Sequence, residues 1–181
     1  MKWLQQLFGG EKDMAALTAG TKAPDFSLAG LDGGTFSLQE ALQRGPVLAA
    51  FFKISCPVCQ YAFPYFQRLY KAHGGPVVSF VAISQDDASK TRGFLKEYGV
   101  TFPALLDDPN GYAASNAYGL TNVPTWFLIG QDGTIELSGV GWSKKDIEEL
   151  NTRVGEARRD SGQELRPLFQ AGEDVRDFRA G

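Results

Sequence analysis

The feature that most restricts the fold of this chain is an apolar run that leads into two closely spaced cysteines. The run Val47–Phe52 is short, uninterrupted and aromatic at its end, which is typical of a strand buried on both faces. After three further residues comes Cys56-Pro57-Val58-Cys59, followed by apolar residues at helical spacing (Phe63, Phe66, Leu69, Tyr70). The cysteines are therefore expected where a buried strand gives way to a helix.

That context gives the two cysteines different surroundings. Pro57 suits the first helical position, because its missing N–H would have no intrahelical partner there. Cys56 then lies at the helix N-terminus, where exposed N–H groups and the positive end of the dipole favour a thiolate. Cys59 lies one turn further along, from where it can attack a disulfide formed at Cys56. This is the geometry of a dithiol redox site.

Three alternative roles for the cysteine pair are weaker. The chain has two cysteines and one histidine, His73, so a tetrahedral zinc site within one chain would need carboxylates. A structural disulfide closing so short a loop would gain little chain entropy. A pair of inert buried thiols is the third alternative. The strand before and the helix after favour redox chemistry. We expect no metal and no cofactor.

Composition limits the partners. The 181 residues fit one domain with appendages, and 43% apolar content is enough for a sizeable core. The 18 basic and 21 acidic residues are mixed, so no nucleic-acid partner is expected. No apolar run approaches membrane-spanning length, and Met1–Phe8 is too short for a secretory signal. We expect a cytoplasmic location, where cysteines are kept reduced.

The rest of the chain alternates between strands and helices. Strands over 25–28 and 35–38 flank a glycine-rich turn and predict a β-hairpin. Ser37 and Ser143 are placed to cap the helices that follow them. After the cysteine helix, which should end near residue 73, we expect a strand over 77–83, a helix over 86–98, an extended stretch over 102–106, a helix over 112–118, strands over 126–129 and 134–140, and a helix over 144–157. This order predicts an α/β fold with a mixed sheet flanked by helices.

Several segments together carry a family resemblance: Ala23–Leu28, Phe51–Phe52, Cys56–Cys59, Phe63–Pro64, Tyr98–Pro103 and Val123–Thr125 before an apolar strand. They resemble the thioredoxin fold and, within it, the TlpA/ResA and AhpC/TSA group of redoxins. The resemblance implies a thioredoxin-like domain over 22–157 with an N-terminal β-hairpin. An N-terminal extension, 1–21, and a C-terminal tail, 158–181, would flank it.

The resemblance also implies a role for Pro124. In the group, a cis-proline faces the two cysteines, and the backbone beside it pairs with an extended substrate. Val123 and Thr125 would border that groove. Because most X–Pro bonds are trans, a proline that merely begins a strand is the alternative role for Pro124.

The chain departs from the group around the cysteines. Members usually carry a buried carboxylate as proton acceptor, at one of two positions that are Ala50 and Ala62 here. Ser55 stands where a tryptophan is usual. Lys53 brings a positive charge that would favour the Cys56 thiolate, and a side chain directed into solvent is the equal alternative.

Two enzyme classes and one non-enzymatic role fit these motifs. In a thiol–disulfide oxidoreductase, Cys56 attacks a substrate disulfide and Cys59 resolves the mixed disulfide. Its partners would be a protein or small-molecule disulfide and an unidentified thiol reductant. In a peroxiredoxin-type peroxidase, Cys56 would pass through a sulfenic acid. The usual Pro-x-x-x-Thr/Ser-x-x-Cys pattern is absent, since Ala49 stands at its proline and Lys53 at its hydroxyl position, so the oxidoreductase is favoured. A redox-sensing adaptor is the non-enzymatic alternative.

The two ends of the chain lie outside the resemblance. Residues 1–9 could form a short amphipathic helix that docks on the domain, or on a membrane or partner. In the tail, Leu168, Phe169 and Phe178 are expected to pack on the core. In some redoxin-like proteins a similar tail continues briefly to a further cysteine or selenocysteine, and a UGA codon after Gly181 would extend this chain in the same way.

Overall fold

A mixed β-sheet forms the centre of the protein. The structure is a computed structural model that describes residues 15–157 and 166–181. The sheet has seven strands in the order β2-β1-β5-β4-β3-β6-β7. The central strand β3 (Val47–Phe52) runs parallel to β4 (Ser79–Ser84) and antiparallel to β6 (Thr125–Ile129). The predicted mixed sheet is therefore confirmed, with the strand before the cysteines at its middle.

The remaining strands extend the sheet to both edges. The predicted N-terminal hairpin is formed by β1 (Ser27–Gly30) and β2 (Thr35–Ser37). The strand β1 also pairs antiparallel with β5 (Ala104–Leu106), which joins the hairpin to the main sheet. At the other edge, β7 (Ile135–Val140) pairs antiparallel with β6. The expected strands are present, with ends that differ by up to two residues from the predicted ones.

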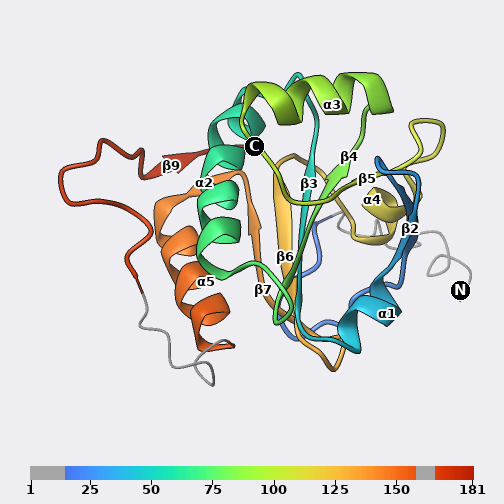
Figure 1. Cartoon of the computed structure of the whole chain (residues 1–181), viewed down its shortest axis with the longest axis horizontal. Helices are drawn as coiled ribbons and strands as arrows, with labels where there is room; N and C mark the ends of the chain where they lie inside the picture. Colours follow the sequence, from blue (N-terminus) through green and yellow to red (C-terminus); the bar gives the residue numbers. More distant parts are fainter. Residues whose placement is uncertain (1–14, 158–165) are drawn as a thin grey trace, which may run out of the picture.

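Helices cover both faces of the sheet (Figure 1). One face carries α2 (Pro57–His73), α3 (Ala88–Glu97) and α5 (Lys144–Glu156), and the other carries α1 (Leu38–Leu42) and α4 (Ala113–Ala117). Successive side chains of a strand point to opposite faces, so β3 contributes to two cores. Its residues 48, 50 and 52 pack with α2, and its residues 47, 49 and 51 pack towards α1 and α4. Burial on both sides explains the continuous apolar run.

The helices that the structure describes begin within two residues of the predicted positions, and all but one have a side-chain cap at the N-terminus. The Ser37 hydroxyl accepts a hydrogen bond from the Glu40 N–H (3.3 Å), and the Ser143 hydroxyl accepts one from the Asp146 N–H (3.2 Å). Each side chain satisfies an N–H that would otherwise lack a partner in the first turn. The exception is α4, which follows Tyr112 in a left-handed conformation (φ 47°) and has no cap of its own.

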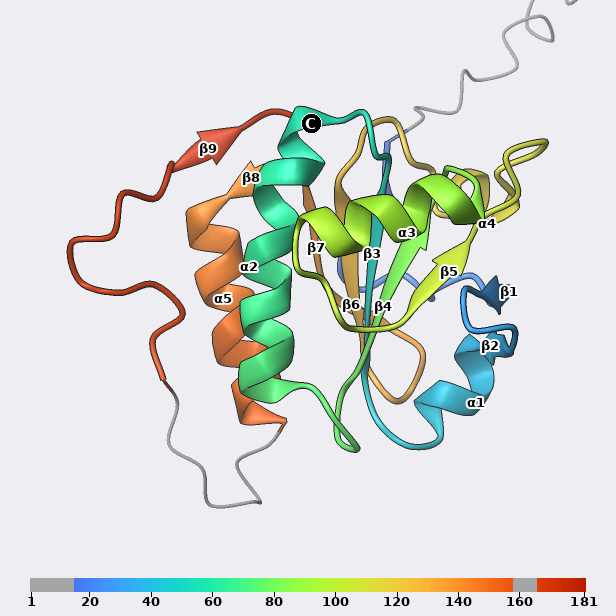
Figure 2. The same ribbon diagram turned by 45° about the horizontal axis from the view of Figure 1, so that its top comes forward.

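The C-terminal residues form a second, two-stranded sheet against the domain. The strand β9 (Phe178–Arg179) pairs antiparallel with β8 (Trp142–Ser143). Leu168 and Phe169 pack on the core beside α2 and α5, as expected. The expectation for Phe178 is wrong, because β9 docks through its backbone and leaves that side chain 66% exposed. In Figure 2 this segment runs along α5 and α2 and ends near the beginning of α2.

The division of the chain into an extension, a domain and a tail stays a prediction. Part of the extension contacts the domain, since the Leu17 N–H donates to the Tyr118 carbonyl (3.1 Å). The expected helix over residues 1–9 lies outside the described residues. Within the described residues, none of the helices combines the length and the apolar character that crossing a membrane requires.

Candidate active site

The two cysteines lie at the junction of β3 and α2, as predicted. Cys56 is the N-cap residue of α2 in an extended conformation, and Pro57 is its first helical residue. The Cys59 N–H donates to Cys56 Sγ (3.3 Å), so the sulfur itself caps the helix. Both thiols are free, and Cys56 is half-buried whereas Cys59 is fully buried. The more accessible sulfur therefore sits on the helix N-terminus, where a negative charge is stabilised.

Burial gives Cys59 the opposite electrostatic setting. Loss of solvent raises the pKa of the Cys59 thiol far above its ordinary value of 9.0, and the charges of Cys56 and Asp86 raise it further. A backbone hydrogen bond from Lys53 lowers that pKa, but burial dominates. Cys59 is therefore protonated near neutral pH. Two thiols one helical turn apart thus have distinct roles available to them.

A cis-proline loop faces the cysteines. The Val123–Pro124 peptide bond is cis, as the resemblance implies. The Cys56 thiol donates to the Val123 carbonyl (3.2 Å), and a pocket of about 260 Å³ opens beside Val123. The Thr125 side chain is fully buried and donates to the Asn122 carbonyl (2.7 Å), so it holds the loop in place. A role of these residues in binding a substrate stays a prediction.

The structure shows where the four residues that depart from the group lie relative to Cys56. The Lys53 side chain is exposed, and the residue reaches the site through its backbone, since the Cys56 N–H donates to the Lys53 carbonyl (3.1 Å). Ala50 and Ala62 are each 1% exposed and lie in the core around α2. Neither can accept a proton. Ser55 is exposed at the position where the group usually has a tryptophan.

The C-terminal residues reach the same loop, which the sequence did not indicate. The Asn122 side-chain amide donates to the Gly181 carbonyl (2.9 Å). The Arg179 guanidinium lies over the Tyr61 ring of α2, 5.6 Å from its centre. Gly141 has a φ of +71° and its backbone lies against Arg179 and Gly181, which leaves no room for a side chain there. The tail therefore covers the flank of the cis-proline loop beside Cys56.

Asp86 is a second residue that sequence reasoning missed, because it was assigned only to a helix start. Its carboxylate accepts a hydrogen bond from the Ile54 N–H (2.8 Å), two residues before Cys56. A signal did exist. Parallel β3 and β4 end together at Phe52 and Ser84, so the residues that follow both strands meet at one edge of the sheet.

Comparisons with known proteins agree with this geometry. Residues 18–154 match the protein family described as Redoxin. The relative named thiol-disulfide oxidoreductase ResA from Halalkalibacterium halodurans is 30% identical over 140 residues, 76% of this chain and 78% of the relative. The solved structure of MTB dsbF in its mixed oxidized and reduced forms has a TM-score of 0.62 at 27% identity, and the match covers 73% of this chain and 94% of dsbF.

One further solved structure is similar to this chain in fold alone. The thioredoxin domain of thiol-disulfide oxidoreductase BVU-2223 from Bacteroides vulgatus has a TM-score of 0.67 at 19% identity, with 76% of this chain and 98% of that domain covered. The thioredoxin-like fold expected from the sequence is thereby confirmed. With three quarters of its length matched to the family and its paired cysteines at the strand-to-helix junction, the chain belongs to the Redoxin family.

Proposed function

We propose that this chain is a thiol–disulfide oxidoreductase that works through Cys56 as nucleophile and Cys59 as resolving thiol. The observation that carries the proposal is the seating of Cys56 Sγ on the N-terminus of α2, with the Cys59 N–H at 3.3 Å and the cis-proline loop opposite. Relatives named thiol-disulfide oxidoreductases support it. The two free thiols are the reduced state of such a pair.

The reaction consists of two exchange steps. The Cys56 thiolate attacks one sulfur of a substrate disulfide, the substrate S–S bond breaks, and the leaving thiolate takes up a proton. Cys59 then loses its proton and attacks Cys56 Sγ, which releases the second substrate thiol and leaves a Cys56–Cys59 disulfide. Because burial raises the pKa of Cys59, this second step is slow near neutral pH. An external thiol reductant returns two electrons to restore the dithiol.

The substrate is a disulfide carried by a protein or by a small molecule. A protein substrate would present an extended segment to the backbone at Val123, whose carbonyl already lies 3.2 Å from Cys56 Sγ. The pocket beside Val123 offers room for a neighbouring side chain. A cytoplasmic location remains a prediction, and fractionation of cells that express the chain would test it.

The proposal is tested by measuring disulfide reduction and peroxide consumption side by side. The wild-type chain should reduce insulin with dithiothreitol in many turnovers per molecule and should consume hydrogen peroxide much more slowly. Cys56→Ser should lose insulin reduction entirely. Cys59→Ser should accumulate a mixed disulfide with the substrate, which mass spectrometry detects, because its resolving thiol is gone.

Two outcomes would contradict the proposal. If wild type reduces insulin no faster than Cys56→Ser, the chain is not a disulfide reductase, and an adaptor role becomes the better hypothesis. If peroxide is consumed faster than insulin is reduced, the peroxidase alternative replaces it. A mixed disulfide that accumulates in Cys56→Ser instead of Cys59→Ser would reverse the two cysteine roles.

A further inference from the structure

The turn before the nucleophile is held at one residue, Ile54, through both of its backbone polar groups. The Ile54 N–H donates to Asp86 Oδ2 (2.8 Å), and the Ile54 carbonyl accepts from the Gln60 side-chain amide (3.0 Å). One anchor comes from the loop after β4 and the other from α2. The Cys56 N–H closes the turn on the Lys53 carbonyl (3.1 Å). The conformation that delivers Cys56 to α2 therefore depends on how the backbone is held at Ile54.

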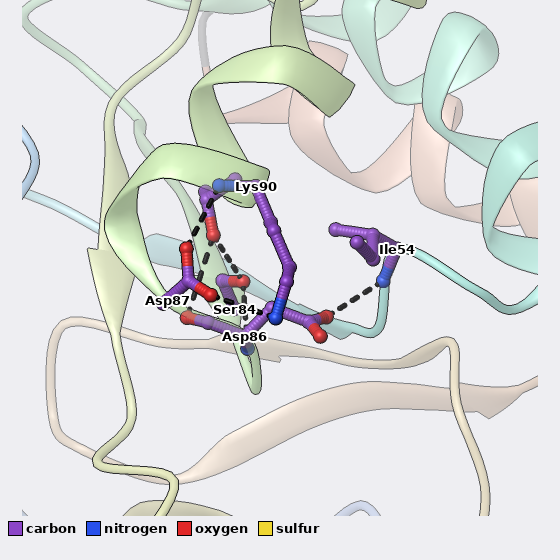
Figure 3. Close-up of polar contacts among 6 residues, drawn as sticks. Ile54, Ser84, Asp86, Asp87 and Lys90 are labelled. Carbon is purple, nitrogen blue, oxygen red and sulfur yellow. Dashed lines mark hydrogen bonds and ion pairs between the residues drawn. The ribbon is translucent and has the colours of Figure 1, made fainter.

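The anchor Asp86 is itself fixed to the sheet. Its N–H donates to the Ser84 hydroxyl (3.1 Å), and that hydroxyl lies 2.6 Å from the Thr91 hydroxyl. Ser84 and Thr91 are both fully buried. Figure 3 shows the Asp86 carboxylate directed towards Ile54. Because the Asp86 backbone is held by buried groups, its carboxylate can fix the position of a loop that has no regular secondary structure.

The charges around Asp86 come from two helices. On α3, Lys90 pairs with Asp87 (2.8 Å), and its pKa is raised by Asp87 first and by Asp86 as a weaker cause. On α2, Asp86 adds to the effects that keep Cys59 protonated. The neighbouring Asp87 differs in its contacts, since it is exposed and its carboxylate caps α3 by accepting from the Lys90 N–H (2.9 Å). Asp86 alone of the two contacts the turn before Cys56.

We propose that Asp86 is a positioning residue for the nucleophile: by holding the Ile54 N–H, it fixes the turn over 53–56 and seats Cys56 Sγ on the N-terminus of α2. The inference rests on the proposed function, because it concerns the thiol that attacks the substrate. A carboxylate that accepts a backbone N–H makes one of the stronger hydrogen bonds in proteins. Without it, Cys56 Sγ would meet the Cys59 N–H for a smaller fraction of the time, and less thiolate would form.

The test measures the rate at which iodoacetamide labels Cys56, as a function of pH, in a Cys59→Ser background that leaves one thiol. Asp86→Ala should slow labelling at neutral pH by about fivefold and move the half-maximal pH upward, because one hydrogen bond is lost. Asp86→Asn keeps an oxygen that can accept the Ile54 N–H, so it should label nearly as fast as the parent. Asp87→Asn makes the same charge change one residue away and should match the parent.

A second variant and a stability measurement distinguish a positioning role from a purely structural one. Gln60→Ala removes the other anchor of the same residue, Ile54, so it should slow labelling in the same direction even if Asp86→Ala does not fold. Thermal unfolding of every variant is recorded, because a purely structural role would lower the melting temperature without moving the labelling profile. Labelling needs no disulfide substrate, so its result is independent of whether insulin is reduced.

Three results would overturn the inference. The first is an Asp86→Ala variant that folds and labels with the parent's rate and pH profile. The second is an Asp86→Asn variant slowed as much as Asp86→Ala, which would show that an oxygen able to accept the Ile54 N–H is not what seats Cys56. The third is an equal slowing in Asp87→Asn. Slow labelling in Asp86→Ala and Gln60→Ala, with Asp86→Asn and Asp87→Asn near the parent, supports it.

Discussion

At the scale of single residues, the site separates two identical side chains by their surroundings. Cys56 caps α2 and is half-buried, whereas Cys59 is completely buried one turn later. Burial disfavours a thiolate and a helix N-terminus favours it, so one turn of helix is enough to divide the nucleophile from the resolving thiol. No carboxylate from β3 or α2 offsets this contrast, because Ala50 and Ala62 occupy those positions.

The buried thiol makes stability depend on pH. The pKa of Cys59 is raised in the folded chain, so above 9.0 the unfolded chain releases a proton that the folded chain retains. We therefore expect the free energy of unfolding of Cys56→Ser, which retains this thiol, to fall as pH rises above 9.0. Urea unfolding of Cys56→Ser and of the double variant Cys56→Ser/Cys59→Ser, from neutral to alkaline pH, measures this effect.

The double variant is the matched control for that experiment. It lacks the titrating thiol but keeps Tyr118, whose pKa burial also raises and which lowers the stability of both variants alike at high pH. The difference in free energy of unfolding between the two variants should be constant near neutral pH. Above pH 9.0 the double variant should become the more stable of the two relative to that difference. Curves that stay parallel throughout would show that Cys59 does not keep its proton in the folded state.

At the scale of elements, the short helix α4 depends on a residue outside it. Asp107, fully buried just after β5, accepts hydrogen bonds from the N–H groups of Ala114 (3.1 Å) and Ser115 (2.8 Å) and from the Ser115 hydroxyl (2.7 Å). The carboxylate replaces the cap that Tyr112 cannot provide. The chain continues from α4 into the cis-proline loop, so this cap also supports one wall of the active site.

We expect Asp107→Ala to lower the free energy of unfolding by about 3 kcal/mol, because buried donors lose a charged acceptor. Urea denaturation provides the measurement. Asp108→Ala is the control, since Asp108 is exposed and accepts from the neighbouring Asn110. It should change stability by less than about 0.5 kcal/mol. A loss in Asp107→Ala as small as the one expected for Asp108→Ala would mean that the Asp107 cap adds nothing to stability.

Local signals explain which elements the sequence could predict. The run Val47–Phe52, the proline after Cys56 and the capping serines act within a few residues, and the structure confirms them. The pairing of β8 with β9 joins two strands of two residues each. Such strands are too short to show the alternation of apolar and polar residues by which a strand is predicted. Asp86 and Asp107 were missed for a related reason, because an acidic residue after a strand usually indicates a turn or a helix cap.

At the scale of the whole molecule, the chain folds back so that its last described residues lie beside its nucleophile. From β9 onward the segment follows β8 and ends against the cis-proline loop, near the beginning of α2 (Figures 1 and 2). A Cβ added to Gly181 would lie 2.9 Å from the Val123 carbonyl oxygen, and Cys56 Sγ lies 3.2 Å from the same oxygen. Two residues far apart in the sequence therefore meet at one carbonyl group.

This closeness predicts a crosslink. In a Cys59→Ser background, Gly181→Cys should form an intramolecular disulfide with Cys56 on mild oxidation, after residue 181 moves away from the Val123 carbonyl and the Gly141 backbone. Phe178→Cys is the control, because that side chain is 66% exposed on β9. Non-reducing electrophoresis and peptide mass mapping measure both. Crosslinking that is equal in the two variants, or only between molecules, would show that the tail does not dock as described.

The position of Gly181 has a practical consequence for purification. A peptide fused after that residue would start beside Cys56, because the Gly181 carbonyl is held by Asn122 of the cis-proline loop. An oligohistidine tag placed there would carry metal-binding imidazoles to the vicinity of a reactive thiol, and thiolates bind the same metals. A bulky fluorescent reporter would obstruct incoming disulfides. Rate constants for this protein should therefore be measured after any such addition has been cleaved off.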